Sequence, residues 1–200
     1  GTRNSFFVGI IATLLATALG TVAALGLSRP HMPFKPVLMA ILISPMIVPL
    51  IITAAGMFFF YSKIGLTHSY LGLILAHTAL GTPFVVITVT ATLTGFDTNL
   101  IRASQSLGAD TMRTFFKIIM PLILPGVISG GLFAFITSFD EVVVVMFIGS
   151  VEQITIPKQM WAGLRQETSP VILCMATCLV ALSIALLTTV EMLRRRSERL

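Results

Sequence analysis

The chain has 200 residues, a formal net charge of +5 and 56% hydrophobic residues, while charged residues make up only 10%. A soluble domain carries about 25% charged residues, so this composition excludes an ordinary soluble fold and predicts a polytopic membrane protein. The positive charge does not indicate a nucleic-acid partner, because the basic residues lie at the ends of apolar stretches, where they anchor membrane topology.

Five apolar stretches are each long enough to cross the hydrocarbon core, which takes about 20 helical residues. Helices are the required form, because lipid cannot satisfy free backbone groups and the alternating pattern of a β-barrel is absent. We therefore expect an all-α polytopic transmembrane helical bundle that forms one domain over residues 1–200. The expected spans run from Ser5 to about Leu27, from Pro36 to about Phe60, from Tyr70 to about Thr92, from Ile118 to about Ile148 and from Val171 to about Met192.

Two prolines, Pro45 and Pro49, lie inside the second stretch. Each removes a backbone donor and frees a carbonyl, so we predict that this helix kinks. Two interpretations stay open: a bend that serves packing, and a bend whose freed carbonyls line a pathway for a solute. His77, in the third stretch, is a second candidate pathway residue, although a single histidine at a helix interface is more often structural.

A polar, charged segment, residues 97–121, separates the third and fourth stretches. Asp97 is among its N-cap candidates, and Gly108 lies between two clusters of apolar residues, so the pattern predicts two short helices with a break at the glycine. With cations around the apolar side chains, the segment could fill a groove on another protein. The alternative is an amphipathic helix that rests on lipid headgroups.

The fourth stretch contains Ser138, Asp140 and Glu141, followed by four valines. Ionised carboxylates at bilayer depth cost several kcal/mol, from about 2.5 upward, unless they face a polar cavity or a partner. One interpretation is a cation-attracting site in a pathway, where adjacent residues on a helix would point about 100° apart. The other is structural: one or both acids cap a helix or pair with polar groups near the external end.

The distribution of Lys and Arg predicts the orientation, because cytoplasmic connections carry the excess of positive charge. One side would hold Arg29, Lys35, Arg102, Arg113, Lys117, Arg194, Arg195, Arg196 and Arg199, and the other Arg3, Lys63, Lys158 and Arg165. We therefore expect the C-terminus inside and Gly1 outside. A short helix over residues 156–165 is expected to lie flat at the external surface.

No catalytic or metal-binding motif is present in the sequence. There is no Gly-rich phosphate loop followed by Lys-Ser/Thr, no His-Glu-x-x-His and no Gly-x-Ser-x-Gly. The two cysteines, Cys174 and Cys178, lie in an apolar stretch without further ligands and are read as small apolar side chains. We therefore expect no cofactor, metal or catalytic residue in this chain, and no ATP hydrolysis by it.

Residues 102–121 resemble the cytoplasmic coupling segment of ATP-binding-cassette importer permeases, whose motif reads Glu-Ala-Ala, three residues, Gly, nine residues, Ile, one residue, Leu-Pro. Ala103, Gly108, Ile118 and Pro121 fall in register, whereas Arg102, Ser104 and Met120 replace Glu, Ala and Leu. The polyamine (spermidine/putrescine) branch of the family is resembled over most of the chain. The residues that carry this second resemblance are Asn4-Ser5, Gly20, Ala23-Ala24, Ser44-Pro45, Gly72 to Thr78, Pro83 to Val86, Gly95 to Asp97 and Ser138 to Glu141.

The resemblance implies a multi-pass permease of the bacterial cytoplasmic (inner) membrane that works by alternating access. Two separate ATPase subunits would bind ATP and Mg, an external substrate-binding protein would deliver cargo, and a second, non-identical permease would complete the pathway. Such permeases usually have six spans, so the resemblance also predicts one span before Gly1. The residues implied in ATPase docking are Arg102, Ala103, Ser104, Leu107, Gly108, Ala109, Asp110, Arg113 and Phe116.

Polyamines are the cargo that the resemblance favours, and Asp140 and Glu141 would attract a polycation if they faced the pathway. Another amine, a sulfur oxyanion, a phosphonate or ferric iron remains an alternative cargo. A passive channel or a membrane scaffold is an alternative of a different class, although neither needs so long a polar segment between spans. An intramembrane enzyme would need a nucleophile and base at a plausible spacing, which the sequence lacks.

Overall fold

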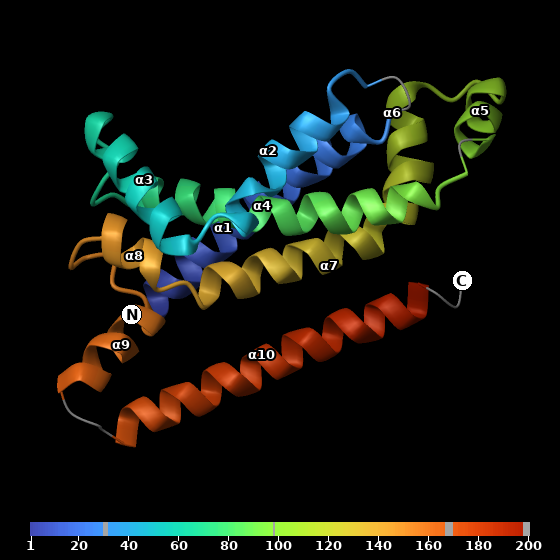
Figure 1. Cartoon of the computed structure of the whole chain (residues 1–200). Coiled ribbons are helices and arrows are strands. Elements are labelled where there is room, and N and C mark those ends of the chain that lie inside the picture. The colour runs from blue at the N-terminus through green and yellow to red at the C-terminus, as the bar shows by residue number, and fades with distance from the viewer. Residues whose placement is uncertain (30–31, 98, 167–169, 198–200) are drawn as a thin grey trace.

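The computed structural model describes residues 1–29, 32–97, 99–166 and 170–197, and over these residues the chain is helical without strands, as expected (Figure 1). The long helices are α1 (Thr2–Leu27), α4 (Tyr70–Thr94), α7 (Met120–Phe139) and α10 (Pro170–Ser197). The shorter ones are α2 (Lys35–Ile47), α3 (Leu50–Lys63), α5 (Asn99–Ser106), α6 (Thr111–Thr114), the π-helical turn η1 (Phe115–Ile119), α8 (Val143–Ile148) and α9 (Ile156–Gln166).

Helices α1, α4 and α7 pack closely on one another and form the core of the bundle. Their contact depends on small residues: a Cβ at Gly130 of α7 would lie 2.8 Å from the Cα of Val85 on α4, and one at Gly20 of α1 would lie 2.6 Å from the Cβ of Val85. Lipid gives no hydrophobic drive for helices to associate, so close van der Waals packing has to supply the attraction.

The second predicted span is broken into α2 and α3, whose axes differ by 105°. The break falls at Pro49, which precedes α3, whereas Pro45 lies within α2 and does not end it. Proline cannot donate to the carbonyl four residues earlier, which for Pro45 is Ile41. The Ser44 hydroxyl donates to that carbonyl at 2.7 Å. The predicted kink of this span is therefore confirmed and falls at Pro49, while α2 continues past Pro45 to Ile47.

The fourth predicted span is wrong at its far end, because helix α7 stops at Phe139 rather than continuing to Ile148. Residues 143–148 form the separate helix α8. Before α7, α6 and η1 continue into it and give an apolar run of 29 residues, Thr111–Phe139. The π turn precedes Pro121, whose ring and missing N–H are incompatible with the α-helical bond to Lys117.

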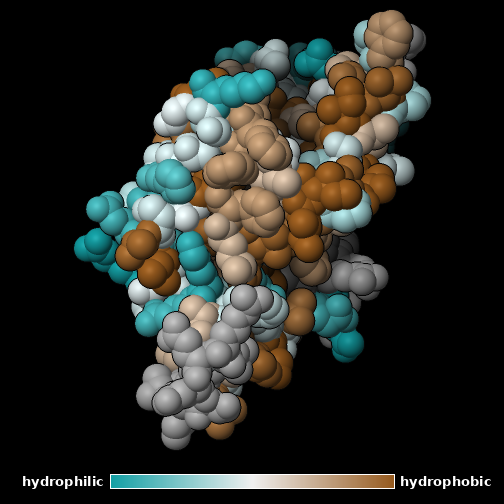
Figure 2. Space-filling view, turned by 60° about the vertical axis from the view of Figure 1, so that its left-hand side comes forward, coloured by the Kyte–Doolittle hydropathy of each residue, from teal (hydrophilic) through white to brown (hydrophobic). Residues whose placement is uncertain are grey.

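By length and composition, α1, α4 and the run Thr111–Phe139 can each cross a membrane, and the bent pair α2–α3 can count as a fourth crossing. In α10 the apolar stretch among described residues is Leu173–Thr189. Large hydrophobic side chains are exposed on the surface (Figure 2), among them Leu14, Val22 and Phe59. An apolar surface of this extent faces lipid or another membrane subunit.

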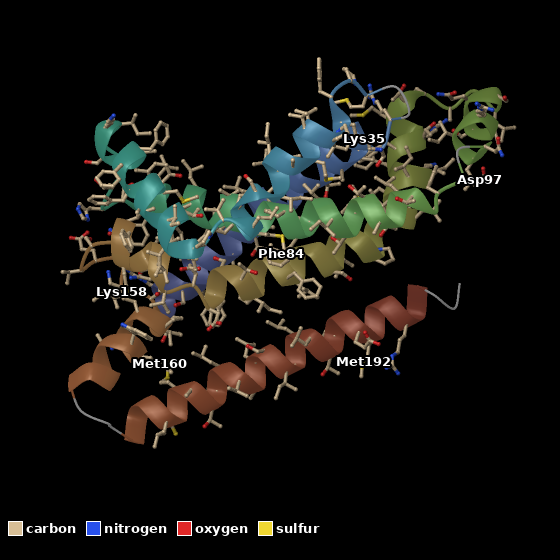
Figure 3. All side chains as sticks on the ribbon, in the orientation of Figure 1. Lys35, Phe84, Asp97, Lys158, Met160 and Met192 are labelled. Atoms are coloured by element: carbon tan, nitrogen blue, oxygen red, sulfur yellow. The ribbon has the colours of Figure 1, made fainter. Side chains whose placement is uncertain are left out.

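The elements of the two predicted sides gather at opposite ends of the bundle (Figure 1). Helices α3, α8 and α9 lie at the end that holds Gly1, whereas α5, α6 and the last described turn of α10 lie at the other. Figure 3 shows Lys158 at the first end, and Lys35 and Asp97 at the second. The helix expected over residues 156–165 is confirmed as α9.

Candidate functional site

The coupling segment, residues 97–121, folds as two helical arms that meet at Gly108. Gly108 has a φ of +81°, in the left-handed region that residues with a Cβ rarely adopt. The turn is closed by the N–H of Gly108, which donates to Gln105 O at 3.0 Å, and by the N–H of Ala109, which donates to Ser104 O at 3.0 Å. The predicted break at the glycine is therefore confirmed, and its cause is a left-handed helix end.

Both arms begin with an aspartate that accepts hydrogen bonds from free backbone N–H groups. Asp97 Oδ1 accepts from the N–H of Asn99 at 2.9 Å, at the start of α5. Asp110 Oδ1 accepts from the N–H of Arg113 at 2.7 Å, at the start of α6. Because each cap stabilises a helix start by about 1 kcal/mol, these short arms are held by local chemistry as well as by packing.

Ser104 and Thr114 join the two arms from the inside. Their hydroxyl oxygens lie 2.8 Å apart and are buried, and Ser104 Oγ also donates to Ile101 O at 3.0 Å. Because the Ser104 hydroxyl hydrogen is used by Ile101 O, the Thr114 hydroxyl is the donor to Ser104 Oγ. Ser104, which the resemblance implies in ATPase docking, therefore has its side chain buried at the junction of the arms.

The outer surface of the coupling segment carries the other predicted docking residues. Leu107 at its tip is 88% exposed and Phe116 is 59% exposed, and beside these predicted residues Met112 on α6 is 66% exposed. The cations Arg102 and Arg113 are exposed beside them. Of the remaining docking residues, Ala103, Gly108 and Asp110 are exposed and Ala109 is half-buried. The outer surface of the segment thus presents exposed apolar side chains together with exposed arginines.

At the opposite end, the adjacent acids Asp140 and Glu141 line the same cavity but differ in burial. They lie between α7 and α8 rather than on one helix, so the expected 100° geometry does not apply. Glu141 is buried, and its Oε1 accepts from the N–H of Val144 at 2.9 Å, which caps the start of α8. Asp140 is exposed, and it lines a cavity of about 480 Å³ together with Glu141 and with Leu50 at the start of α3.

Lys158 of α9 caps the other end of α8. Its Nζ donates to Val145 O at 3.1 Å and to Gly149 O at 3.3 Å. Burial lowers the pKa of the Lys158 amine from its ordinary value. A carboxylate at the start of a helix and an ammonium at its end both interact favourably with the helix dipole. Side chains therefore stabilise both ends of α8. Lys158 was missing from the sequence-based site, since nothing in a lone lysine indicates carbonyls 9 and 13 residues earlier.

The start of α1 is fastened to the loop after α8. Asn4 Nδ2 donates to Glu152 O at 2.7 Å and to Ile154 O at 3.0 Å, and the Tyr70 hydroxyl donates to Asn4 Oδ1 at 3.0 Å. Ser5 Oγ accepts from the N–H of Ile156 at 2.8 Å. The sequence shows polar residues at the start of an apolar stretch, but their partners about 150 residues away have no local signal.

His77 and Ser138 meet in the interior between α4 and α7. His77 Nδ1 and Ser138 Oγ lie 2.7 Å apart, and both residues are buried. His77 Nε2 has no hydrogen-bond partner among the described residues. The two predicted pathway residues are thus brought together, whereas Pro45 and Pro49 lie on the separate α2–α3 bend. No cluster of three or more His, Cys, Asp or Glu side chains suited to a metal occurs in the described part of the chain.

Residues 16–199 match the family described as binding-protein-dependent transport system inner membrane component, and the chain belongs to this family. The spermidine/putrescine transport system permease protein PotC of Haemophilus influenzae is 30% identical over 195 residues, which cover 98% of this chain and 76% of the relative. The putrescine transport system permease protein PotI of Escherichia coli K12 is 28% identical, with 88% of this chain and 65% of the relative covered.

Solved structures agree with the fold. The inward-facing MetNI methionine ABC transporter contains a chain that superposes with a TM-score of 0.77 at 19% identity, covering 98% of this chain and 94% of that one. An amino acid ABC transporter gives a TM-score of 0.70 at 16% identity, with 98% and 92% covered. The chain is therefore a multi-pass inner-membrane permease subunit of an ATP-driven importer. It works with an ATPase, a substrate-binding protein and another permease subunit, and is not itself the catalyst.

Proposed function

We propose that this chain forms half of the translocation pathway of a polyamine importer of the bacterial inner membrane. The cargo assignment is supported by the likeness to permeases named for spermidine and putrescine, at 30% identity over 98% of the chain. It is also supported by Asp140, an exposed carboxylate in a cavity, because a polycation is attracted to negative charge.

The coupling segment carries the proposal for the mechanism. Two ATPase subunits would serve the complex, and one would receive the tip around Leu107 in a groove. The capped arms and the Ser104–Thr114 contact favour rigid-body movement of the segment, so closure of the ATPases on ATP would be passed to α7 through the continuous run Thr111–Phe139. Alternating access follows if this movement reorients the spans, and ATP hydrolysis then resets them.

The remaining partners follow from the same reading. An external substrate-binding protein would deliver cargo at the end formed by α3, α8 and α9, and a non-identical second permease would complete the pathway. The coupling segment and the C-terminal end of α10 would then lie in the cytoplasm. This orientation agrees with the positive-inside rule, because the connections at that end carry Arg29, Lys35, Arg102, Arg113 and Lys117.

The decisive test is ATP hydrolysis by the whole assembly in lipid with its binding protein, across polyamines, amino acids, oxyanions and ferric iron. Stimulation by spermidine or putrescine alone supports the proposal. Stimulation by an oxyanion, a phosphonate or ferric iron keeps the importer and rejects the polyamine cargo. Failure to copurify with any ATPase subunit would reject the coupled importer in favour of a channel or scaffold.

A further inference from the structure

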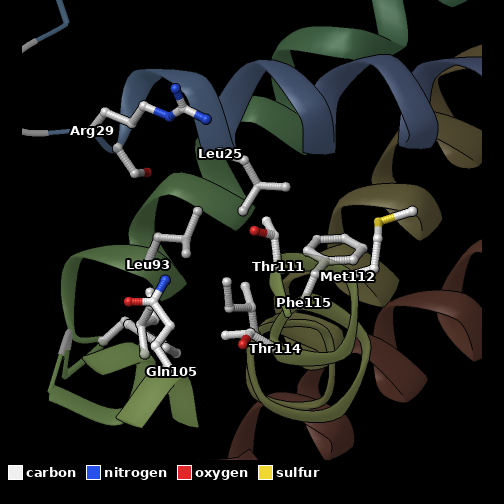
Figure 4. A pocket seen from close by; sticks show the side chains of 12 residues that line it. Leu25, Arg29, Leu93, Gln105, Thr111, Met112, Thr114 and Phe115 are labelled. Atoms are coloured by element: carbon white, nitrogen blue, oxygen red, sulfur yellow. The ribbon is translucent and has the colours of Figure 1, made fainter. Parts of the chain in front are cut away.

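A cavity of about 440 Å³ lies between the coupling segment and the ends of the spans. Leu25 of α1 lines it on the span side, together with Leu93 and Phe96 at the end of α4. Ile101, Met112 and Phe115 line it on the side of the coupling segment (Figure 4). The volume lies in the range of small-molecule sites, about 300–1,000 Å³, and the walls are mostly apolar.

Among the polar side chains that line this cavity, one carries a charge that could bind a ligand. The Ser28 hydroxyl donates to Ala24 O at 2.7 Å, and the Thr114 hydroxyl is engaged by Ser104. Arg29 is the only charged residue among those that line the cavity, and it is exposed and forms no ion pair within the described part of the chain. The site thus offers an apolar slot with an unpaired cation, which suits an anion that carries a hydrocarbon tail.

The position of the cavity indicates where such a ligand comes from. Helix α1 ends at Leu27 and α4 ends at Thr94, so the cavity lies at the level where two apolar spans stop. That is the depth of lipid headgroups, and basic pockets at helix ends on this face of a membrane bind anionic headgroups. We propose that the cavity binds one anionic phospholipid, with its phosphate at Arg29 and an acyl chain between Leu93 and Phe115.

The bound lipid would contact the span ends and the coupling segment together. It would therefore fill the space between the coupling segment, which receives the ATPase, and the spans, which move. It would also stabilise the attachment of α5 and α6 to the spans. The inference needs the membrane embedding of the chain but not the identity of the cargo, so it can fail or hold separately from the polyamine proposal.

The test is native mass spectrometry of the permease–ATPase complex after equilibration in nanodiscs that contain equal phosphatidylglycerol and phosphatidylcholine. The wild type should retain one phosphatidylglycerol per permease chain in preference to phosphatidylcholine. Arg29→Gln should lower that retention about fivefold, the factor that corresponds to about 1 kcal/mol for one basic residue at an anionic surface. Lys35→Gln is the matched control, because it removes one charge at the same end outside the cavity and should retain lipid as the wild type does.

A second variant tests the slot itself. Thr111→Trp places a large ring in the cavity and should displace both lipids, while copurification of the ATPase reports that the coupling segment is still folded. Equal phosphatidylglycerol retention by Arg29→Gln and the wild type would overturn the proposal, and so would equal loss in Lys35→Gln. Unchanged lipid retention by Thr111→Trp would also reject the site. So would the finding that, in a complex without lipid, the ATPase subunit itself covers the cavity.

Discussion

Ser104 and Thr114, ten residues apart and on opposite sides of Gly108, share a buried hydroxyl contact of 2.8 Å. This contact joins the two arms of the coupling segment across its interior, in addition to the turn at Gly108. A pair of arms that is fixed at the turn and across the interior can move as one body, which a mechanical link between ATPase and spans requires.

Removing one member of this pair should loosen the segment. Ser104→Ala leaves the Thr114 hydroxyl buried without its partner, at a cost of about 1–3 kcal/mol. We expect a lower thermal midpoint for the complex and weaker ATPase binding. The double variant Ser104→Ala, Thr114→Val should lose less than the sum of the two single variants, because the residues are in contact.

The control for this prediction is Ser106→Ala. Ser106 is exposed, and its hydroxyl donates to Arg102 O on its own helix at 3.0 Å. A change there should stay within about 0.5 kcal/mol. Strictly additive losses in the double variant would show that the Ser104–Thr114 contact does not stabilise the segment.

Gly108→Ala should weaken the coupling segment through backbone strain and not through crowding. The φ of +81° disfavours any residue with a Cβ by about 1–2 kcal/mol, although nothing lies within 4 Å of the added carbon. We expect reduced transport per ATP hydrolysed, measured in proteoliposomes. Gly56→Ala in α3 is the matched control, since it also has open space around it but ordinary helical φ, and should be neutral or stabilising. Full coupling in Gly108→Ala would contradict the role of the turn.

The exposed tip should govern ATPase binding. Leu107→Asp places a charge on an apolar docking surface and should weaken the affinity for the ATPase subunit roughly tenfold or more, with little change in thermal stability. Arg113→Glu should act in the same direction if the partner groove is acidic. Val151→Asp at the opposite end is the control, because Val151 is 83% exposed and should leave ATPase affinity unchanged. Wild-type affinity in Leu107→Asp would place the docking surface elsewhere.

Substitutions of Asp140 and of Glu141 should have different effects, the first on uptake and the second on stability. Asp140→Asn keeps the size of an exposed side chain and removes its charge, so we expect polyamine uptake to fall roughly tenfold, which corresponds to about 1.4 kcal/mol, while the complex still assembles. Glu141→Leu removes the cap of α8 and should lower stability by about 0.5–2 kcal/mol. Glu141→Gln keeps an acceptor for the N–H of Val144 and should be milder. Normal uptake by Asp140→Asn would show that Asp140 does not contact cargo.

Local sequence pattern was enough for the elements whose signals are local. The helices α1, α4 and α9 lie where the apolar runs and the short amphipathic pattern predict them, and the turn at Gly108 follows from a glycine between two periodic clusters. The residue order did not show which of Pro45 and Pro49 breaks the span, because the Ser44 hydroxyl that satisfies Ile41 O depends on a rotamer that the order does not specify.

The ends of the fourth span and the partners of its polar residues were decided by the tertiary structure. An apolar run from Met120 to Ile148 has no marker for the stop at Phe139 except the acids themselves, and those are equally compatible with a continuous helix that faces a cavity. Glu141 caps α8 through a local bond to the N–H of Val144, three residues later, whereas Lys158 reaches Val145 O only because the loop after α8 brings the start of α9 close to it.

The sequence by itself determined that the chain is helical, lies in a membrane and carries a polar segment with the spacing of the coupling motif, because composition, run length and motif spacing are properties of the chain order. Only the tertiary structure decided which hydroxyl is buried, which acid is free and where a cavity opens beside Arg29. Burial and hydrogen-bond partners depend on which helices approach each other, and that approach is set by small residues such as Gly20 and Gly130 meeting Val85 across three helices.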